Sequence, residues 1–237
     1  MQLFDRGRLA ESEFTQWTLV EGAPRRCLDE RFRALVARGA TLVLNNFEKQ
    51  LAGAQRLCEE VNRFCGFPTR SNAYFSSGGA GSFGAHWDTH DVVVLQLVGR
   101  KRWRVSPPTF PLPLPGQTST RSGQAAPPGA ALDVLLEPGD ALYLPRGWWH
   151  DVTPLPEPSL HLSVGIYTPS VLDALTWISH RVLPQQLDAR RSAIDQAATL
   201  ENLTSLLDVL KASLDDADLM DRLNRELMSP ARTPPPT

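Results

Sequence analysis

Three side chains in two separate motifs have the types and spacing that suit a metal ion. His86 and Asp88 stand two residues apart. On an extended chain, residues i and i+2 project to the same side, so these two can converge on one point. His150 comes much later, at the end of residues 139–150, directly after a Pro-x-Gly turn. Two histidines and one carboxylate form a facial triad that leaves metal positions open, as in non-haem Fe(II) oxygenases.

An H-x-D pair alone is a common surface pattern, and a lone histidine such as His150 is commonly a hydrogen-bonded core residue. The combination of both motifs in a strand-rich block favours a metal site over these alternatives. Two further histidines, His90 and His161, are expected to be a surface and a core residue respectively, since the triad is complete without them.

The segments around both motifs have the pattern of short β-strands separated by Gly/Pro turns. Alternating or continuously apolar runs predict strands at residues 41–44, 71–76, 92–98, 101–106, 132–136, 141–144 and 160–167. Apolar residues at helical spacing predict helices at 28–38 and 51–64 before most of the strands. After the strands, helices are predicted from a Thr168-Pro169 cap to Pro184, then at 200–214 and 219–227. This order predicts a mainly β domain, a barrel or sandwich, with flanking helices.

Residues 107–131 contain seven prolines and form a long loop in this scheme. Two interpretations stay open: the loop lies over the mouth of the site and helps to select substrate, or it is a mobile excursion. Among the nearby tryptophans, Trp103 is expected in the barrel core. One of Trp148 and Trp149 is expected to form a wall of the pocket.

Composition excludes several classes of protein. The chain of 237 residues carries 24 basic and 26 acidic residues, a net charge of −2, whereas proteins held by nucleic-acid phosphates usually carry a basic excess. No apolar run approaches the roughly 18 residues of a membrane span. Three cysteines, at positions without a disulfide-framework spacing, fit a reducing compartment. We therefore expect a cytoplasmic protein without a direct nucleic-acid or membrane partner.

The two motifs also carry a family resemblance. Residues 139–150 resemble the second motif of the cupin superfamily, Gly-x5-Pro-x-Gly-x-x-His, while an H-x-D stands where many cupins have H-x-H. That departure is typical of the JmjC branch, the Fe(II)- and 2-oxoglutarate-dependent oxygenases. Within this branch, residues 86–105 and 144–150 look like the ribosomal-protein hydroxylases. The resemblance covers roughly residues 40–170 and implies a double-stranded β-helix, or jelly-roll, core.

The resemblance assigns roles to single residues. It implies that His86, Asp88 and His150 are the iron ligands and that Lys101 binds the distal carboxylate of 2-oxoglutarate. It further implies that Asn72, Tyr74 and Ser163 line the cosubstrate pocket. Without the resemblance, Lys101 would be interpreted as a solvated hairpin residue, and Asn72 with Tyr74 as an ordinary edge-strand pair. Lys101 is nevertheless the only lysine in the strand block of an arginine-rich chain.

The resemblance also suggests a domain organisation. We expect a catalytic domain over residues 1–169, a helical segment over 170–229 that forms a homodimer, and a disordered tail over 230–237. The leucine-rich helices could instead cover the barrel. We expect no counterpart of the family's winged-helix domain after these helices. Residues 188–226 contain nine acidic and five basic residues, which argues against a nucleic-acid surface.

The function implied is that of a dioxygenase that uses Fe(II), 2-oxoglutarate and dioxygen to hydroxylate an amino-acid side chain in a protein or peptide. Arginine and histidine are the favoured targets. Two alternatives stay open. One is a tailoring hydroxylase of a peptide or amino-acid-derived metabolite, which the lack of a winged helix favours. The other is a metal-binding cupin without oxygenase activity.

Overall fold

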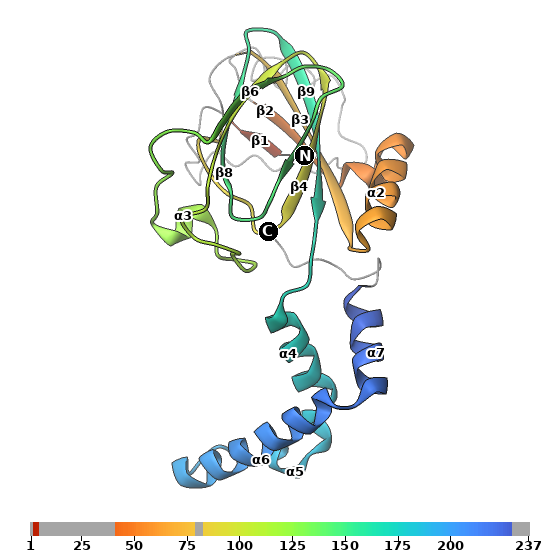
Figure 1. Cartoon of the computed structure of the whole chain (residues 1–237), viewed down its shortest axis with the longest axis vertical. Helices are drawn as coiled ribbons and strands as arrows, with labels where there is room; N and C mark the ends of the chain where they lie inside the picture. The colour runs from red at the N-terminus through yellow and green to blue at the C-terminus, as the bar shows by residue number, and fades with distance from the viewer. Residues whose placement is uncertain (1, 5–40, 79–82, 229–237) are drawn as a thin grey trace, which may run out of the picture. The chain divides into compact units, whose positions relative to one another are not determined.

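The structure is a computed structural model that describes residues 2–4, 41–78 and 83–228. The helix predicted at 28–38 and the tail predicted at 230–237 lie outside these residues. The chain divides into two compact units, of which the larger contains the β-strands and the smaller contains the helices after residue 167 (Figure 1).

The larger unit consists of two antiparallel sheets. One sheet has the strand order β1-β2-β3-β9-β4-β7 and the other the order β6-β5-β8. Their bounds are β1 Gln2–Phe4, β2 Thr41–Asn45, β3 Thr69–Ser77, β4 Asp91–Val98, β5 Lys101–Ser106, β6 Leu132–Leu136, β7 Ala141–Leu144, β8 Trp149–Pro154 and β9 Pro158–Ile166. Every pairing is antiparallel. The mainly β, double-sheet architecture predicted from the sequence is therefore confirmed.

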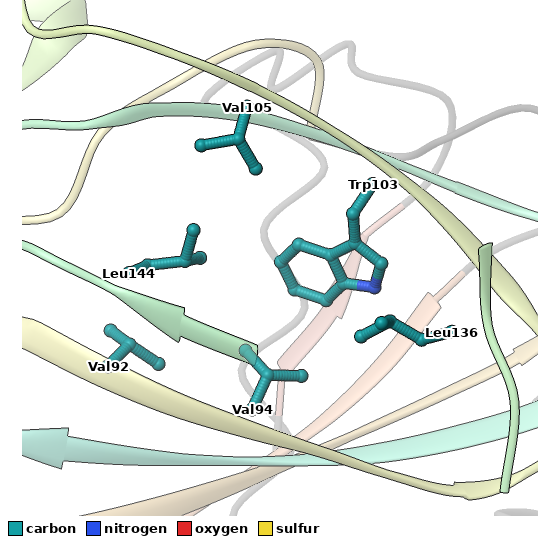
Figure 2. Packing of buried hydrophobic residues seen from close by; sticks show 6 residues of the cluster. All are labelled: Val92, Val94, Trp103, Val105, Leu136 and Leu144. Carbon is teal, nitrogen blue, oxygen red and sulfur yellow. The ribbon is translucent and has the colours of Figure 1, made fainter. Parts of the chain in front are cut away.

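Apolar side chains from both sheets pack together in the interior. Figure 2 shows the cluster, which consists of Val92, Val94, Trp103, Val105, Leu136 and Leu144. Val94 is completely buried and Trp103 is 2% exposed, which confirms the core position expected for this tryptophan. Burial of one such aliphatic side chain stabilises a fold by about 1.5–3 kcal/mol. The cluster therefore holds the two sheets at a fixed separation around the site.

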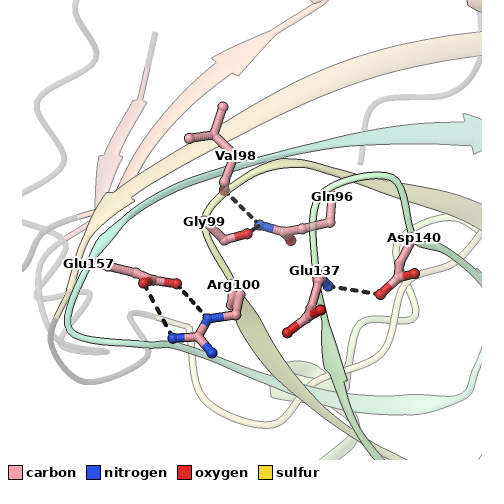
Figure 3. A network of polar contacts seen from close by, with 7 residues as sticks. All are labelled: Gln96, Val98, Gly99, Arg100, Glu137, Asp140 and Glu157. Carbon is pink, nitrogen blue, oxygen red and sulfur yellow. Dashed lines mark hydrogen bonds and ion pairs between the residues drawn. The ribbon is translucent and has the colours of Figure 1, made fainter.

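A polar network fixes the turn between β4 and β5 (Figure 3). The buried Gln96 side chain donates from Nε2 to two carbonyls of the turn, one of them that of Gly99, at 2.9 Å. Gly99 has a φ of 58°, and a Cβ there would lie 2.1 Å from the carbonyl oxygen of Pro158, so only glycine fits. Arg100 forms an ion pair with Glu157 at 3.0 Å. The first residue of β5 is thereby held in one orientation.

The helices and 3-10 turns of the larger unit occupy loops between strands. They are η2 Phe47–Lys49, α2 Ala52–Cys65 and α3 Ser119–Ser122. Helix α2 buries Ala54 and Cys58 against Ala73, Leu162 and Val164 of the six-stranded sheet. This packing covers β3 and β9, the strands that supply most of the polar side chains described below.

The smaller unit contains α4 Val171–Arg181, η3 Leu183–Gln185, α5 Leu187–Arg190, α6 Gln196–Leu214 and α7 Ala217–Leu227. The cap of α4 differs from the prediction, because Ser170 and Asp173 form a capping box one residue beyond Thr168-Pro169. A serine hydroxyl and a carboxylate at this spacing satisfy two free backbone donors, which a Thr-Pro start cannot do. The indole of Trp177 and the guanidinium of Arg181 both donate to Glu226, which joins α4 to α7.

Candidate metal centre and cofactor cavity

Reciprocal backbone hydrogen bonds join the two motifs. His86 N donates to His150 O at 3.0 Å, and His150 N donates to His86 O at 2.8 Å. Gly147 N also donates to Asp88 O at 2.9 Å. His150 is the second residue of β8, whereas His86 and Asp88 lie in the loop before β4. His86 and His150 thus pair through an isolated bridge outside the ladders of the two sheets.

The three predicted metal ligands lie together. One ligand atom from each of His86, Asp88 and His150 lies within 4.8 Å of the other two. His86 Nδ1 contacts Gly84 O at 2.9 Å, and His150 Nδ1 contacts Trp148 O at 3.2 Å. A carbonyl oxygen only accepts, so each Nδ1 carries the proton and each Nε2 is left as an electron-pair donor. We call these three residues the triad, and its donor set fits a divalent iron ion.

The pKa shifts in the triad suit metal binding. Burial and the neighbouring His86 lower the pKa of His150 to about 4. Burial alone would raise the pKa of Asp88, but His90, His150 and His86 together lower it. At neutral pH, His150 is therefore an uncharged imidazole and Asp88 is a carboxylate, the forms in which both bind metals.

The triad opens into a cavity of about 190 Å³, which lies between the two sheets. All four predicted cosubstrate residues line it, namely Asn72, Tyr74, Lys101 and Ser163. In the sheet, Asn72 lies opposite Ser163 in the pairing of β3 with β9. Lys101 is 1% exposed, which is not the solvated hairpin position of the alternative interpretation. Burial lowers the pKa of Lys101 to about 7.

The structure places both remaining histidines of the strand block on the cavity wall. His90, expected at the surface, is half-buried and stacks on Tyr167 with ring centroids 4.7 Å apart. His161 is a buried core residue, as expected, and it also contacts Lys101. The sequence signal for His161 was its position two residues before Ser163, which puts both on one face of a strand. Arg70 also lines the cavity and was not singled out from the sequence.

The tryptophan next to each triad motif packs on the proline-rich loop rather than into the cavity. Trp87 and Trp149 form an edge-to-face pair with centroids 4.7 Å apart. Trp149 Nε1 donates to Thr109 Oγ1 at 3.0 Å, and Trp87 Nε1 donates to Gln117 O at 3.1 Å. Among the described residues, neither Trp149 nor Trp148 lines the cavity, so the pocket wall predicted for one of them is wrong.

The same loop approaches the turn before His150. A Cβ at Gly147 would lie 2.8 Å from Pro113 Cδ, and the φ of Gly147 is 84°. None of the described residues 107–131 lines the cavity, which argues against a cover over its mouth. The loop instead supports the triad from the side of Trp87 and Trp149.

Two antiparallel sheets around a two-histidine, one-carboxylate group, of which His150 is buried, define a cupin with the donor set of non-haem Fe(II) oxygenases. Residues 43–174 match the JmjC domain family, and the chain belongs to that family. The predicted resemblance is therefore confirmed at the level of the family and the fold.

Parts of the chain are similar in sequence to named proteins. The chain is 31% identical over 158 residues to the "bifunctional lysine-specific demethylase and histidyl-hydroxylase NO66" of Drosophila persimilis, covering 63% of this chain and 23% of that protein. It is 41% identical over 99 residues to "ribosomal oxygenase 1" of Gallus gallus, covering 41% of this chain and 16% of that protein. The chain thus spans less than a quarter of the length of these relatives.

Among solved structures, the Escherichia coli ribosomal oxygenase YcfD in complex with cobalt and 2-oxoglutarate is similar in fold. The TM-score is 0.60 at 24% identity, covering 80% of this chain and 51% of that one. Among the described residues, no helix has the length and apolar character needed to cross a membrane.

The hydrogen bond from the Trp149 indole to the Thr109 hydroxyl can be tested with a double-mutant cycle. We expect Trp149→Phe and Thr109→Val each to lower the free energy of unfolding by about 1 kcal/mol, because each removes one partly buried hydrogen bond. Urea unfolding of the singles and the double variant measures the coupling. Additive losses in the double variant would show that the two side chains do not interact in solution.

Proposed function

We propose that this chain is an Fe(II)- and 2-oxoglutarate-dependent dioxygenase that hydroxylates an amino-acid side chain in a protein. The observation that supports it most is the coexistence of the triad and a buried lysine in one cavity. A metal site alone occurs in many cupins, whereas a desolvated cation beside it has a use in holding an anionic cosubstrate.

Each residue of the cavity has a part in this proposal. His86, Asp88 and His150 would hold Fe(II) through two Nε2 atoms and one carboxylate oxygen. Lys101 would bind the distal carboxylate of 2-oxoglutarate, and Asn72, Tyr74 and Ser163 would line the same pocket as hydrogen-bonding groups. When bound, Fe(II) and 2-oxoglutarate supply the oxidising chemistry that inserts one atom of dioxygen into a C–H bond, with release of succinate and carbon dioxide.

The chain's own contribution is orientation and the exclusion of water. The backbone hydrogen bonds between His86 and His150 fix the spacing of the two residues, and the Nδ1 contacts with Gly84 O and Trp148 O orient the two imidazoles. Val92, Val94 and Leu144 form an apolar wall of the cavity. An apolar wall keeps competing water out and strengthens the electrostatic contacts of Lys101.

Charge in the cavity favours histidine over arginine as the target side chain. Asp88 is the only carboxylate among the described residues that line the cavity, and it belongs to the triad. Arg70 adds a positive charge to the wall, where it donates to Asn46 Oδ1 at 3.3 Å. A cationic guanidinium would enter without a partner of opposite charge, which costs more than the entry of an uncharged imidazole. The name of the relative NO66 includes histidyl-hydroxylase activity, which supports the same target.

We further propose that the catalytic domain ends near residue 169 and that the helical segment 170–229 forms a homodimer. Large apolar side chains stand exposed on α6, including Leu200, Leu203, Leu207 and Leu214 at 52–65% exposure. Contiguous apolar surface of this kind is typical of a protein–protein interface.

The cofactor site is tested by anaerobic titration of the protein with Fe(II) and then 2-oxoglutarate. A visible charge-transfer band is expected in the wild type. His150→Ala should remove the band. Lys101→Ala should bind iron normally but require at least about tenfold more 2-oxoglutarate, because a charge-assisted hydrogen bond is lost. The exposed His180→Ala in α4 is the matched control. Iron binding without a band in the wild type would instead identify a cupin that is not an oxygenase.

The substrate is tested with matched peptide libraries in which a central histidine or arginine is varied, alongside whole ribosomes. Mass spectrometry should find a gain of one oxygen atom on histidine-containing polypeptides, for the charge reasons given above. Preferred turnover of arginine peptides would contradict the assignment. Turnover of free amino-acid derivatives but no polypeptide would identify a tailoring enzyme.

The dimer is tested by sedimentation velocity of the full chain. Leu207→Glu is expected to convert a dimer to monomer, since a buried unpaired charge destabilises an interface. Glu201→Lys changes charge at an exposed site of the same helix and serves as control. A monomeric wild type would refute the proposal.

A further inference from the structure

The imidazole of His161 is held rigidly beside Lys101. It stacks on Tyr74 with ring centroids 4.7 Å apart and an interplanar angle of 10°. Trp103 meets it edge to face at 5.3 Å and 72°. The ring lies between two aromatic side chains, and His161 is only 5% exposed. The imidazole is therefore held in a single orientation, with Nδ1 directed at Lys101.

Lys101 uses fixed acceptors on this wall. Its Nζ lies 2.9 Å from His161 Nδ1 and 3.0 Å from the carbonyl oxygen of Tyr74. An ammonium has three N–H donors and no acceptor, so when Lys101 is charged, Nδ1 of His161 accepts and the imidazole is neutral with its proton on Nε2. Two N–H donors of the Lys101 ammonium are thus directed at His161 Nδ1 and Tyr74 O, and the third is left for a ligand in the cavity.

We infer that His161 is a positioning residue for 2-oxoglutarate, which holds the Lys101 ammonium charged and directed at the distal carboxylate. This role rests on the proposed function, in which Lys101 binds that carboxylate. It concerns one end of the cosubstrate only, because the triad lies at the other end and binds the 2-oxo acid group.

The electrostatics around the pair agree with this role. Burial, the positive charge of Lys101 and the proximity of His150 on β8 lower the pKa of His161 well below its usual range, so His161 is neutral at neutral pH. Tyr74 on β3 is protonated, because burial and the charge of Asp88 raise its pKa. With the pKa of Lys101 near 7, the acceptor at His161 stabilises the charged form of Lys101 in an otherwise desolvating site.

These charges predict a direction for the pH dependence of binding. The carboxylate binds the ammonium and not the neutral amine, so affinity for 2-oxoglutarate should be highest below about pH 7 and fall as pH rises. Loss of the acceptor at position 161 lowers the pKa of Lys101 further, so the fall should begin at a lower pH.

The experiment compares wild type, His161→Phe and His161→Asn, each loaded anaerobically with Fe(II) and titrated across a pH series. Phenylalanine keeps the stack on Tyr74 but removes the acceptor, whereas asparagine retains an acceptor oxygen. The titrants are 2-oxoglutarate and 2-oxobutanoate, which lacks the distal carboxylate. We expect His161→Phe to bind 2-oxoglutarate about tenfold more weakly, in line with one lost hydrogen bond to a charged group. It should bind 2-oxobutanoate and Fe(II) like the wild type, and His161→Asn should recover most of the loss.

The outcomes separate this inference from the proposed function. Equal affinity and an unchanged pH profile in His161→Phe, with normal wild-type binding, would overturn the inference and leave the function standing. An equal loss for both 2-oxo acids would also overturn it, because such a loss reports general damage to the pocket. If the wild type binds no 2-oxoglutarate, the proposed function fails and the inference fails with it.

Discussion

The reciprocal backbone hydrogen bonds between His86 and His150 are the constraint on which the site depends. They join the loop before β4 to the start of β8, and so they connect a loop of the six-stranded sheet to the three-stranded sheet. Once this bridge forms, Asp88 lies beside the two imidazoles without further adjustment. The register of β3 with β9 then lines up Asn72 with Ser163 and Tyr74 with His161 along the same cavity. The chemistry of the site is thus set mainly by backbone pairing.

The fold could be predicted from the sequence largely because strands and turns are encoded locally. Residues 132–136 and 141–144 were predicted with the bounds that β6 and β7 have, since alternation and the flanking Gly/Pro turns mark both ends. The triad was also predictable, because each half lies in a short motif of its own. His86 lies outside the named strands, and a single bridge to His150 orients that residue.

What the sequence left open depends on contacts between distant segments. The roles of Trp87 and Trp149 are set by Thr109 and Gln117, whose positions follow from the path of a proline-rich loop that no periodicity specifies. The contact of His161 with Lys101 crosses from one sheet to the other, so it depends on how the Val94 and Trp103 cluster spaces the sheets. Side-chain alternation assigned His161 to the interior but could not name its partner.

The hydrogen bonds that Gly84 and Trp148 accept from the two triad imidazoles have a consequence for metal selectivity. Backbone carbonyls fix both rings, so the site offers the same two nitrogens and one oxygen to whichever divalent ion arrives. Affinity among first-row ions then follows the general order that rises from manganese through iron to copper. Correct loading with iron would depend on the supply of metals in the cell, and zinc, nickel and copper would be effective inhibitors wherever their free concentrations rise.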